Sequence, residues 1–308
     1  MSRPKRGFVY GLQWWWRTRI AAWWRVWLPA RVDAAKRASE TGSQAGIAFH
    51  RRADALPDGD ADEDGVTAIL TVYKRGHYLS RQIDALRQQS IPPREIWVWC
   101  NDNDDVALDV SDIADRVIVS NSNWKFWGRF SLASMARTPW ICLLDDDILP
   151  EPDWLSSCLA TWRGGYPGIL GGSGVILPRE ARYSSKHKVG WNGHHYVDTT
   201  EVDLVGHAWF FHRDHLQYLW REPPVSWENG EDIHFSAMAL KHGDVHTYVP
   251  PHPESNPAIW SCRPDFGKIA GRTRTATHNT SGHGSTRDEV VRSLREGGWQ
   301  VLAERDEP

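Results

Sequence analysis

The stretch ICLLDDDILPEPDWL (residues 141–155) places three adjacent carboxylates directly after a short apolar run. An apolar run of this length before a polar turn is typical of a buried strand. Adjacent carboxylates repel one another and burial raises that cost, so such a group needs protons or a cation. In an extended segment the side chains alternate, so we expect Asp145 and Asp147 to point to one side and Asp146 to the other.

This arrangement predicts a hard-oxygen site at Asp145 and Asp147 for Mn²⁺ or Mg²⁺ and the phosphates of a substrate. One of the three aspartates can instead accept a hydrogen bond from a ribose hydroxyl. The alternative is a solvated acidic turn that stabilises the N-terminus of the next helix.

The segments around the triplet predict an α/β fold. Apolar strands are expected at 66–73, 95–102 and 116–121, and helices at 76–90 and 130–138. Strands that alternate with helices indicate a mostly parallel sheet flanked by helices. In such sheets ligands bind beyond the carboxyl ends of the strands, where the triplet lies.

The second half of the chain is less regular. A strand that enters a helix is expected at 201–216, and a loop that leads into a helix at 227–243. Thr286 with Glu289 three residues later is typical of a capping box, which predicts a last helix at 286–297.

Composition bounds the class and location of the protein. Four cysteines among 308 residues show no paired or metal-type spacing, so we expect buried free thiols and a cytoplasmic protein. No apolar stretch reaches the ~20 residues that cross a bilayer. Residues 1–37 carry a net charge of +8, and the total of −3 leaves −11 for the rest.

These features divide the chain into a basic Trp-rich amphipathic arm (1–37), a flexible linker (38–65) and a catalytic domain (66–308). The domain is expected to hold a nucleotide-binding half (66–150), an acceptor half (151–285) and the C-terminal helix.

The arm contains six tryptophans within fourteen residues, and several of its apolar side chains share one helical face. Tryptophan favours the water–hydrocarbon boundary and arginine favours anionic headgroups, so residues 8–28 predict peripheral contact with the inner face of a membrane. The alternative is a helix that packs on the catalytic domain or on an oligomeric partner.

Several motifs occur in order along residues 66–285: TVYKR (71–75), ND (101–102), NSNWKFWGRF (121–130), LLDDD (143–147), VGHAWFF (205–211) and GEDIHFS (230–236). Together they resemble the GT-A (Rossmann-like) class of nucleotide-sugar glycosyltransferases, most closely the exostosin-like enzymes and then the bacterial family-two transferases. The resemblance implies Mn²⁺- or Mg²⁺-dependent transfer of a hexosyl or N-acetylhexosaminyl group from a UDP-sugar to a saccharide or lipid-linked acceptor.

The resemblance also implies a set of donor contacts, which are Thr71, Tyr73, Arg75, Asn101, Asp102, Asn123, Arg129, Asp145 and Asp146. The ring of Tyr73 suits stacking on uracil, and Arg75 suits bidentate pairing with a phosphate. Asn101 and Asp102 have ordinary turn chemistry as their alternative. This sequence has Gly128-Arg129-Phe130 where the family has Asn-Arg-Phe. Gly128 therefore replaces the asparagine that contacts the donor in the family.

Glu231 and Asp232 follow Gly230 at the start of a predicted helix. A carboxylate there suits the base that deprotonates an acceptor hydroxyl, or a group that stabilises an oxocarbenium ion. The family-two pattern favours Asp232 and the exostosin-like pattern favours Glu231, so both are candidates and the stereochemistry stays open. The alternative is a pair of helix N-terminal charges.

The histidines divide into two groups. His207, His212 and His215 match no zinc spacing and are predicted to be structural, as are Trp209 and Phe210, whose alternative is an acceptor pocket. In the late segment RTRTATHNTSGHGS (272–285), His278 is a candidate metal ligand, and Arg272 or Arg274 is a candidate phosphate contact; a polar connector is the alternative. Residues 190–198 are predicted to be an acceptor-side loop.

Two other functions fit the same motifs. A nucleotidyltransferase also uses an α/β sheet, a metal and paired aspartates, and a degenerate transferase domain would bind sugar or membrane without catalysis. We expect no nucleic-acid partner.

Overall fold

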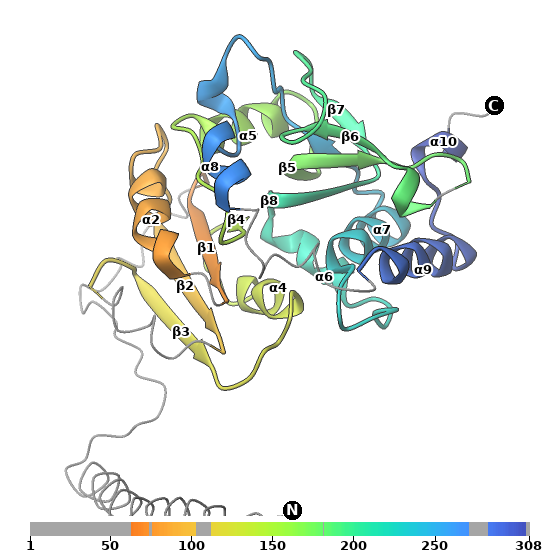
Figure 1. Ribbon diagram of the computed structural model, residues 1–308, viewed down its shortest axis with the longest axis horizontal. Helices are drawn as coiled ribbons and strands as arrows, with labels where there is room; N and C mark the ends of the chain where they lie inside the picture. The colour runs from red at the N-terminus through yellow and green to blue at the C-terminus, as the bar shows by residue number, and fades with distance from the viewer. Residues whose placement is uncertain (1–62, 74–75, 103–111, 181, 271–282, 306–308) are drawn as a thin grey trace, which may run out of the picture. The chain divides into compact units, whose positions relative to one another are not determined.

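The computed structural model describes residues 63–73, 76–102, 112–180, 182–270 and 283–305 (Figure 1). The predicted arm and most of the predicted linker lie outside these residues, as do Arg75, Arg274 and His278. Among the described helices, none is both long enough and apolar enough to cross a membrane.

One sheet holds the described strands in the order β3-β2-β1-β4-β8-β5-β9-β7, with β6 paired to β5. Their bounds are β1 Val66–Val72, β2 Glu95–Asn101, β3 Arg116–Ser120, β4 Trp140–Leu144, β5 Ile169–Ile176, β6 His187–Gly190, β7 Thr200–Val202, β8 Leu204–His212 and β9 Thr247–Val249. The main helices are α2 Leu79–Arg87, α4 Trp127–Ala133, α5 Trp154–Arg163, α6 Leu216–Leu219, α7 Glu231–Gly243, α8 Pro264–Ala270, α9 His283–Glu296 and α10 Leu302–Arg305.

The predicted α/β fold is confirmed, and its parallel part lies where the apolar runs predicted it. β3, β2, β1 and β4 pair in parallel. Beyond them β8 runs antiparallel to both β4 and β5, so the chain returns along the triplet-bearing strand in the opposite direction.

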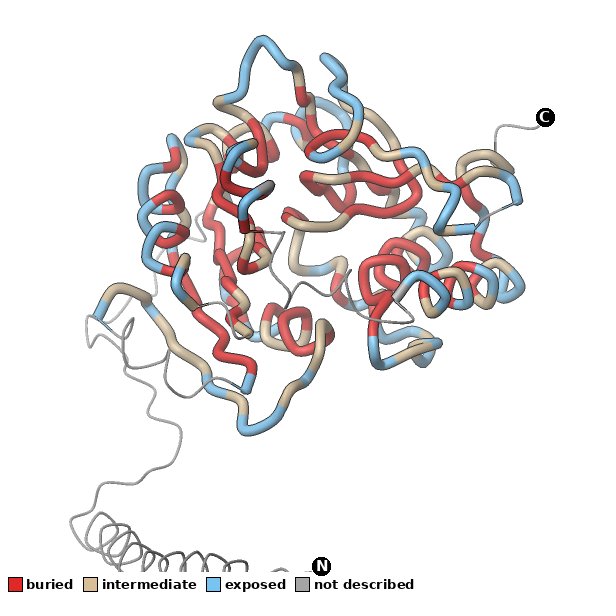
Figure 2. The backbone as a smooth tube through the Cα atoms, in the orientation of Figure 1, coloured by how far each residue is buried: buried red, intermediate tan, exposed pale blue. Residues whose placement is uncertain are grey.

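Strand alternation divides the core into two layers, one on each face of the sheet. On one face, side chains of β1, β2 and β4 pack against α2, α5 and α8. On the other face they pack against α4, α6 and α7. Figure 2 shows the central strands buried along most of their length. The four cysteines are free and buried, as predicted.

The helix predicted at 286–297 corresponds to α9 and begins earlier than predicted. α9 begins at His283, so Thr286 lies inside the helix and its predicted capping role is wrong. α7 ends at Gly243 as predicted, and the next residue, Asp244, takes the left-handed conformation that closes a helix.

Gly128, at the departure from the family pattern, has a packing explanation. A Cβ at this position would overlap the indole carbons of Trp99, which is buried in β2. The bulk of Trp99 therefore excludes the asparagine that the resemblance would place here.

Gly128→Ala is expected to destabilise the protein by about 1–3 kcal/mol, because the helix and the indole must move apart. Urea denaturation measures this change. Gly284→Ala in α9 is the control: its Cβ would meet nothing within 4 Å, and alanine is the better helix former, so stability should stay equal or rise. Equal stability of the two variants would contradict the packing explanation.

Candidate active site

The carboxylate triplet forms a turn at the end of β4. The Ile148 N–H donates to the Asp145 carbonyl at 3.2 Å, so the predicted extended conformation is wrong. The side-chain amide of Gln82, from α2, donates to the carbonyls of Asp145 at 2.8 Å and Ile148 at 2.6 Å. Since α5 begins only at Trp154, the triplet does not occupy a helix N-terminus.

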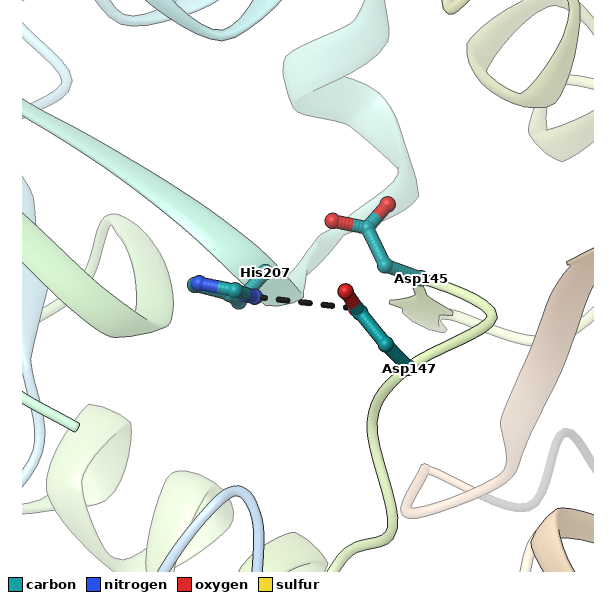
Figure 3. A group of neighbouring side chains, drawn as sticks. All are labelled: Asp145, Asp147 and His207. Atoms are coloured by element: carbon teal, nitrogen blue, oxygen red, sulfur yellow. Dashed lines mark ion pairs between the residues drawn. The ribbon is translucent and has the colours of Figure 1, made fainter. Parts of the chain in front are cut away.

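The turn nevertheless brings the side chains of Asp145 and Asp147 together, and His207 joins them (Figure 3). One ligand atom from each residue lies within 4.8 Å of the others. The Nδ1 of His207 is 4.0 Å from Oδ1 of Asp147. This nitrogen is buried, and within the described part of the chain it has no hydrogen-bond partner. Two carboxylates and an open imidazole nitrogen are a donor set that fits a divalent cation.

The strand pairing explains the position of His207. Leu144 pairs with Ala208 in the antiparallel ladder, and one step further the Asp145 N–H donates to the His207 carbonyl at 3.1 Å. His207 has a φ of 70°, in the left-handed region that a non-glycine residue rarely adopts. His207, which was predicted from the sequence to be structural, is therefore placed beside Asp145 and Asp147 as a candidate metal ligand.

An aromatic side chain adjoins this group. The ring of Trp191 meets the His207 imidazole edge to face, with centroids 4.5 Å apart. Residues 190–198, the predicted acceptor-side loop, therefore begin beside the candidate metal ligands. Trp209 is 2% exposed and lies in the core, as predicted.

Arg129 connects the carboxylate triplet to the acidic pair Glu231 and Asp232. Its guanidinium donates to Asp145 and, at 2.8 Å, to Oε1 of Glu231. The same group lies 4.3 Å from the centre of the Trp209 ring. Burial lowers the pKa of Arg129, but Asp145 and Glu231 outweigh it, so the pKa is raised. Arg129 was predicted from the sequence to contact the donor. Only 2% of the residue is exposed, so Arg129 lies beneath the surface.

The acidic pair opens α7 and is buried. Burial, then the negative charge of Asp232, raises the pKa of Glu231 to about 7, against the opposing effect of Arg129 and Arg287. Within the described residues, Oε2 of Glu231 has no hydrogen-bond partner. Both oxygens of Asp232 are engaged, by Arg287 at 2.5 Å and by the Ile233 N–H at 2.8 Å.

Arg287 comes from α9, and sequence reasoning missed it. The acidic pair Glu231 and Asp232 also lies close to the carboxylate triplet. A Cβ on Gly206 would lie 3.7 Å from Oδ2 of Asp232. Gly206 directly precedes His207, so Asp232 lies close to the strand segment that carries the third candidate ligand.

The predicted nucleoside contacts cluster at the carboxyl ends of β1 and β2. The buried hydroxyl of Thr71 has no hydrogen-bond partner in the described part of the chain. Asn101 and Asn123 bond to each other at 2.9 Å, and Asn101 also accepts from the Trp124 N–H at 2.9 Å. These amides therefore hold the loop before α4, while the neighbouring Asp102 is exposed.

The comparison with known families decides the class. Residues 67–220, half of the 308, match the model of glycosyl transferase family 2. The chain belongs to glycosyl transferase family 2. Family-2 membership supports glycosyl transfer and favours it over the nucleotidyltransferase alternative. The matched range includes Asp145, Asp147 and His207, whereas Glu231 and Asp232 lie beyond it.

Two crystal structures of S. aureus TarS are similar to this family-2 chain. One is 14% identical with a TM-score of 0.43, over 61% of this chain and 36% of the other. The second, of TarS residues 1–349, is 13% identical with a TM-score of 0.44, over 61% of this chain and 60% of the other. The match thus spans less than two thirds of either TarS chain. No curated protein matches the sequence.

Proposed function

We propose that this family-2 enzyme transfers a hexosyl or N-acetylhexosaminyl group from a UDP-sugar to a saccharide or lipid-linked acceptor, with Mn²⁺ or Mg²⁺ as cofactor. The observation that carries the proposal is the group of Asp145, Asp147 and His207 at the carboxyl end of β4. An imidazole beside two carboxylates favours Mn²⁺ over Mg²⁺, because Mg²⁺ binds mainly oxygen ligands.

Asp145, Asp147 and His207 would hold the ion, and His278 is a further candidate ligand from outside the described residues. When bound, the ion supplies positive charge against the departing diphosphate. Tyr73 is proposed to stack on the base, and Thr71 offers a hydroxyl whose hydrogen-bonding capacity is unused in the described residues. Arg75, Asp146 and Arg274 stay proposed donor contacts, and membrane contact through residues 8–28 stays a prediction.

Glu231 is proposed as the base that takes the proton of the acceptor hydroxyl. Its Oε2, which has no hydrogen-bond partner among the described residues, and its pKa of about 7 suit a proton acceptor near neutral pH. Asp232, bonded to Arg287, is proposed to keep the start of α7 in place beside Glu231.

Calorimetry with UDP, with and without Mn²⁺, tests the metal site. The wild type should bind UDP more tightly with Mn²⁺, and Asp147→Ala should lose about tenfold to a hundredfold of that metal-linked affinity. Hydrolysis of UDP-sugars should fall in the same variant.

Asp153→Ala is the matched control, since this aspartate lies in the same loop and makes no capping hydrogen bond. If Mn²⁺ leaves the UDP affinity of the wild type unchanged, the domain is a degenerate module and the proposal fails.

A further inference from the structure

Two large aromatic side chains are exposed in the segment between α6 and α7. Trp220 is 44% exposed and Trp227 is 59% exposed. Their rings lie 6.4 Å apart and within 23° of parallel. Both contact Trp127, at 5.7 Å and 5.4 Å. These three residues form the tryptophan cluster.

The tryptophan cluster involves two helices that carry candidate active-site residues, α4 and α7. Trp127 begins α4, two residues before Arg129, and its ring lies 5.5 Å from that of His234 in α7. Trp227 belongs to the segment between α6 and α7 that leads directly into Glu231 (Figure 1). The tryptophan cluster is therefore connected to the candidate active site through α4, which carries Arg129, and α7, which begins at Glu231.

Two buried polar atoms, one in the cluster and one in the segment that follows Trp227, have no hydrogen-bond partner in the described part of the chain. The indole N–H of Trp127 and the Oδ1 of Asn229 are buried, and neither finds a hydrogen bond within the described residues. Trp127 is 4% exposed and Asn229 is 7% exposed. A buried unsatisfied polar group costs about 1–3 kcal/mol. An open donor within the cluster and an open acceptor two residues after Trp227 suit the hydroxyl groups of a ligand, which both donate and accept.

The charges near the cluster do not favour an anionic surface as its partner. Residues 220–230 hold one cation, Arg221, against Glu222 and Glu228. Lys125 pairs with Glu228 at 3.0 Å. Binding to anionic headgroups needs an excess of unpaired cations, which this segment lacks. Flat aromatic faces with balanced charge complement a neutral ligand.

We propose that the tryptophan cluster is a subsite for the pyranose rings of a neutral saccharide acceptor. The indole faces of Trp220 and Trp227 stack on the C–H faces of the sugar, which the negative face of an aromatic ring attracts. The inference rests on the proposed function. It adds that the enzyme recognises the saccharide part of the acceptor and not the lipid.

The test is calorimetry of the full chain with cellohexaose, maltohexaose and chitohexaose, in the absence of donor and metal. At least one should bind, and the double variant Trp220→Ala/Trp227→Ala should weaken that binding about tenfold. Phenylalanine at both positions should retain most of the affinity, because a ring face remains. Tyr166→Ala removes another exposed aromatic, 39% exposed, and should change nothing.

Circular dichroism melts establish that each variant is folded. Absence of binding for all three saccharides, or equal affinity of the wild type and the alanine pair, overturns the inference. So does cluster-dependent binding to phosphatidylcholine–phosphatidylglycerol vesicles without saccharide binding. The titration contains neither UDP nor Mn²⁺, so its failure is distinguishable from failure of the metal-linked UDP experiment.

Discussion

Arg129→Met is expected to destabilise the protein by about 3–5 kcal/mol, the cost of leaving buried charges without their partner. The guanidinium is 2% exposed and bonds to Asp145 and Glu231, whose side chains are 30% and 6% exposed. Without it, Glu231 keeps Asp232 as a negative neighbour in a buried site. Urea denaturation at neutral pH measures the loss.

Two further variants isolate the cause. Glu231→Gln in the Arg129→Met background should restore part of the stability, because it removes one of the unpaired charges. Arg163→Met breaks an exposed pair with Asp64 and should leave stability unchanged. The interpretation is wrong if Arg129→Met unfolds at the same urea concentration as the wild type.

Glu231→Gln is expected to lower the turnover of UDP-sugar hydrolysis by about 10²–10⁴-fold, the usual contribution of a general base. The amide keeps the shape of the side chain but cannot accept the proton. Asp232→Asn should cost less, because both oxygens of Asp232 already accept hydrogen bonds. A larger loss in Asp232→Asn would assign the base to Asp232.

The same assignment predicts a pH dependence. Burial raises the pKa of Glu231 from 4.5 to about 7, so the carboxylate fraction rises as pH increases through about 7. Turnover of the wild type should rise as pH increases through about 7 and then level, and the residual turnover of Glu231→Gln should lack this limb.

Stability should change in the opposite sense. A folded pKa above the unfolded value stabilises the fold below pH 4.5, and this contribution is lost as pH rises to about 7. Urea denaturation across this range checks it: Glu231→Gln should show a smaller decline than the wild type. An identical decline in both proteins would mean that another group titrates.

The local sequence predicted the first half of the sheet well. The apolar runs at β1, β2 and β4 are long enough to specify buried parallel strands, and a carboxylate triplet after one of them marks a strand end. The same segment predicted that the side chains of Asp145 and Asp147 lie on one side. They do, but a turn and not an extended strand brings them together. Short-range patterns carry this information because neighbours in sequence are neighbours in space.

Local sequence patterns do not predict tertiary contacts, as three residues show: His207, Arg129 and Arg287. His207 reaches the triplet only because β8 pairs antiparallel with β4, and no spacing within its own segment reveals that register. Gly128, in α4, departs from the family pattern because Trp99, on strand β2, fills the space.

The sequence by itself thus determined the α/β class, the position of the acidic turn and the acids at the start of α7. Tertiary structure alone decided which groups share their charge: Arg129 and Glu231 bond across 102 positions of the chain, and Arg287 reaches Asp232 across 55. The physical reason is that periodicity specifies which face of a strand or helix is buried. The partner of a buried charge depends on how strands are ordered and helices packed, which is set by the whole chain at once.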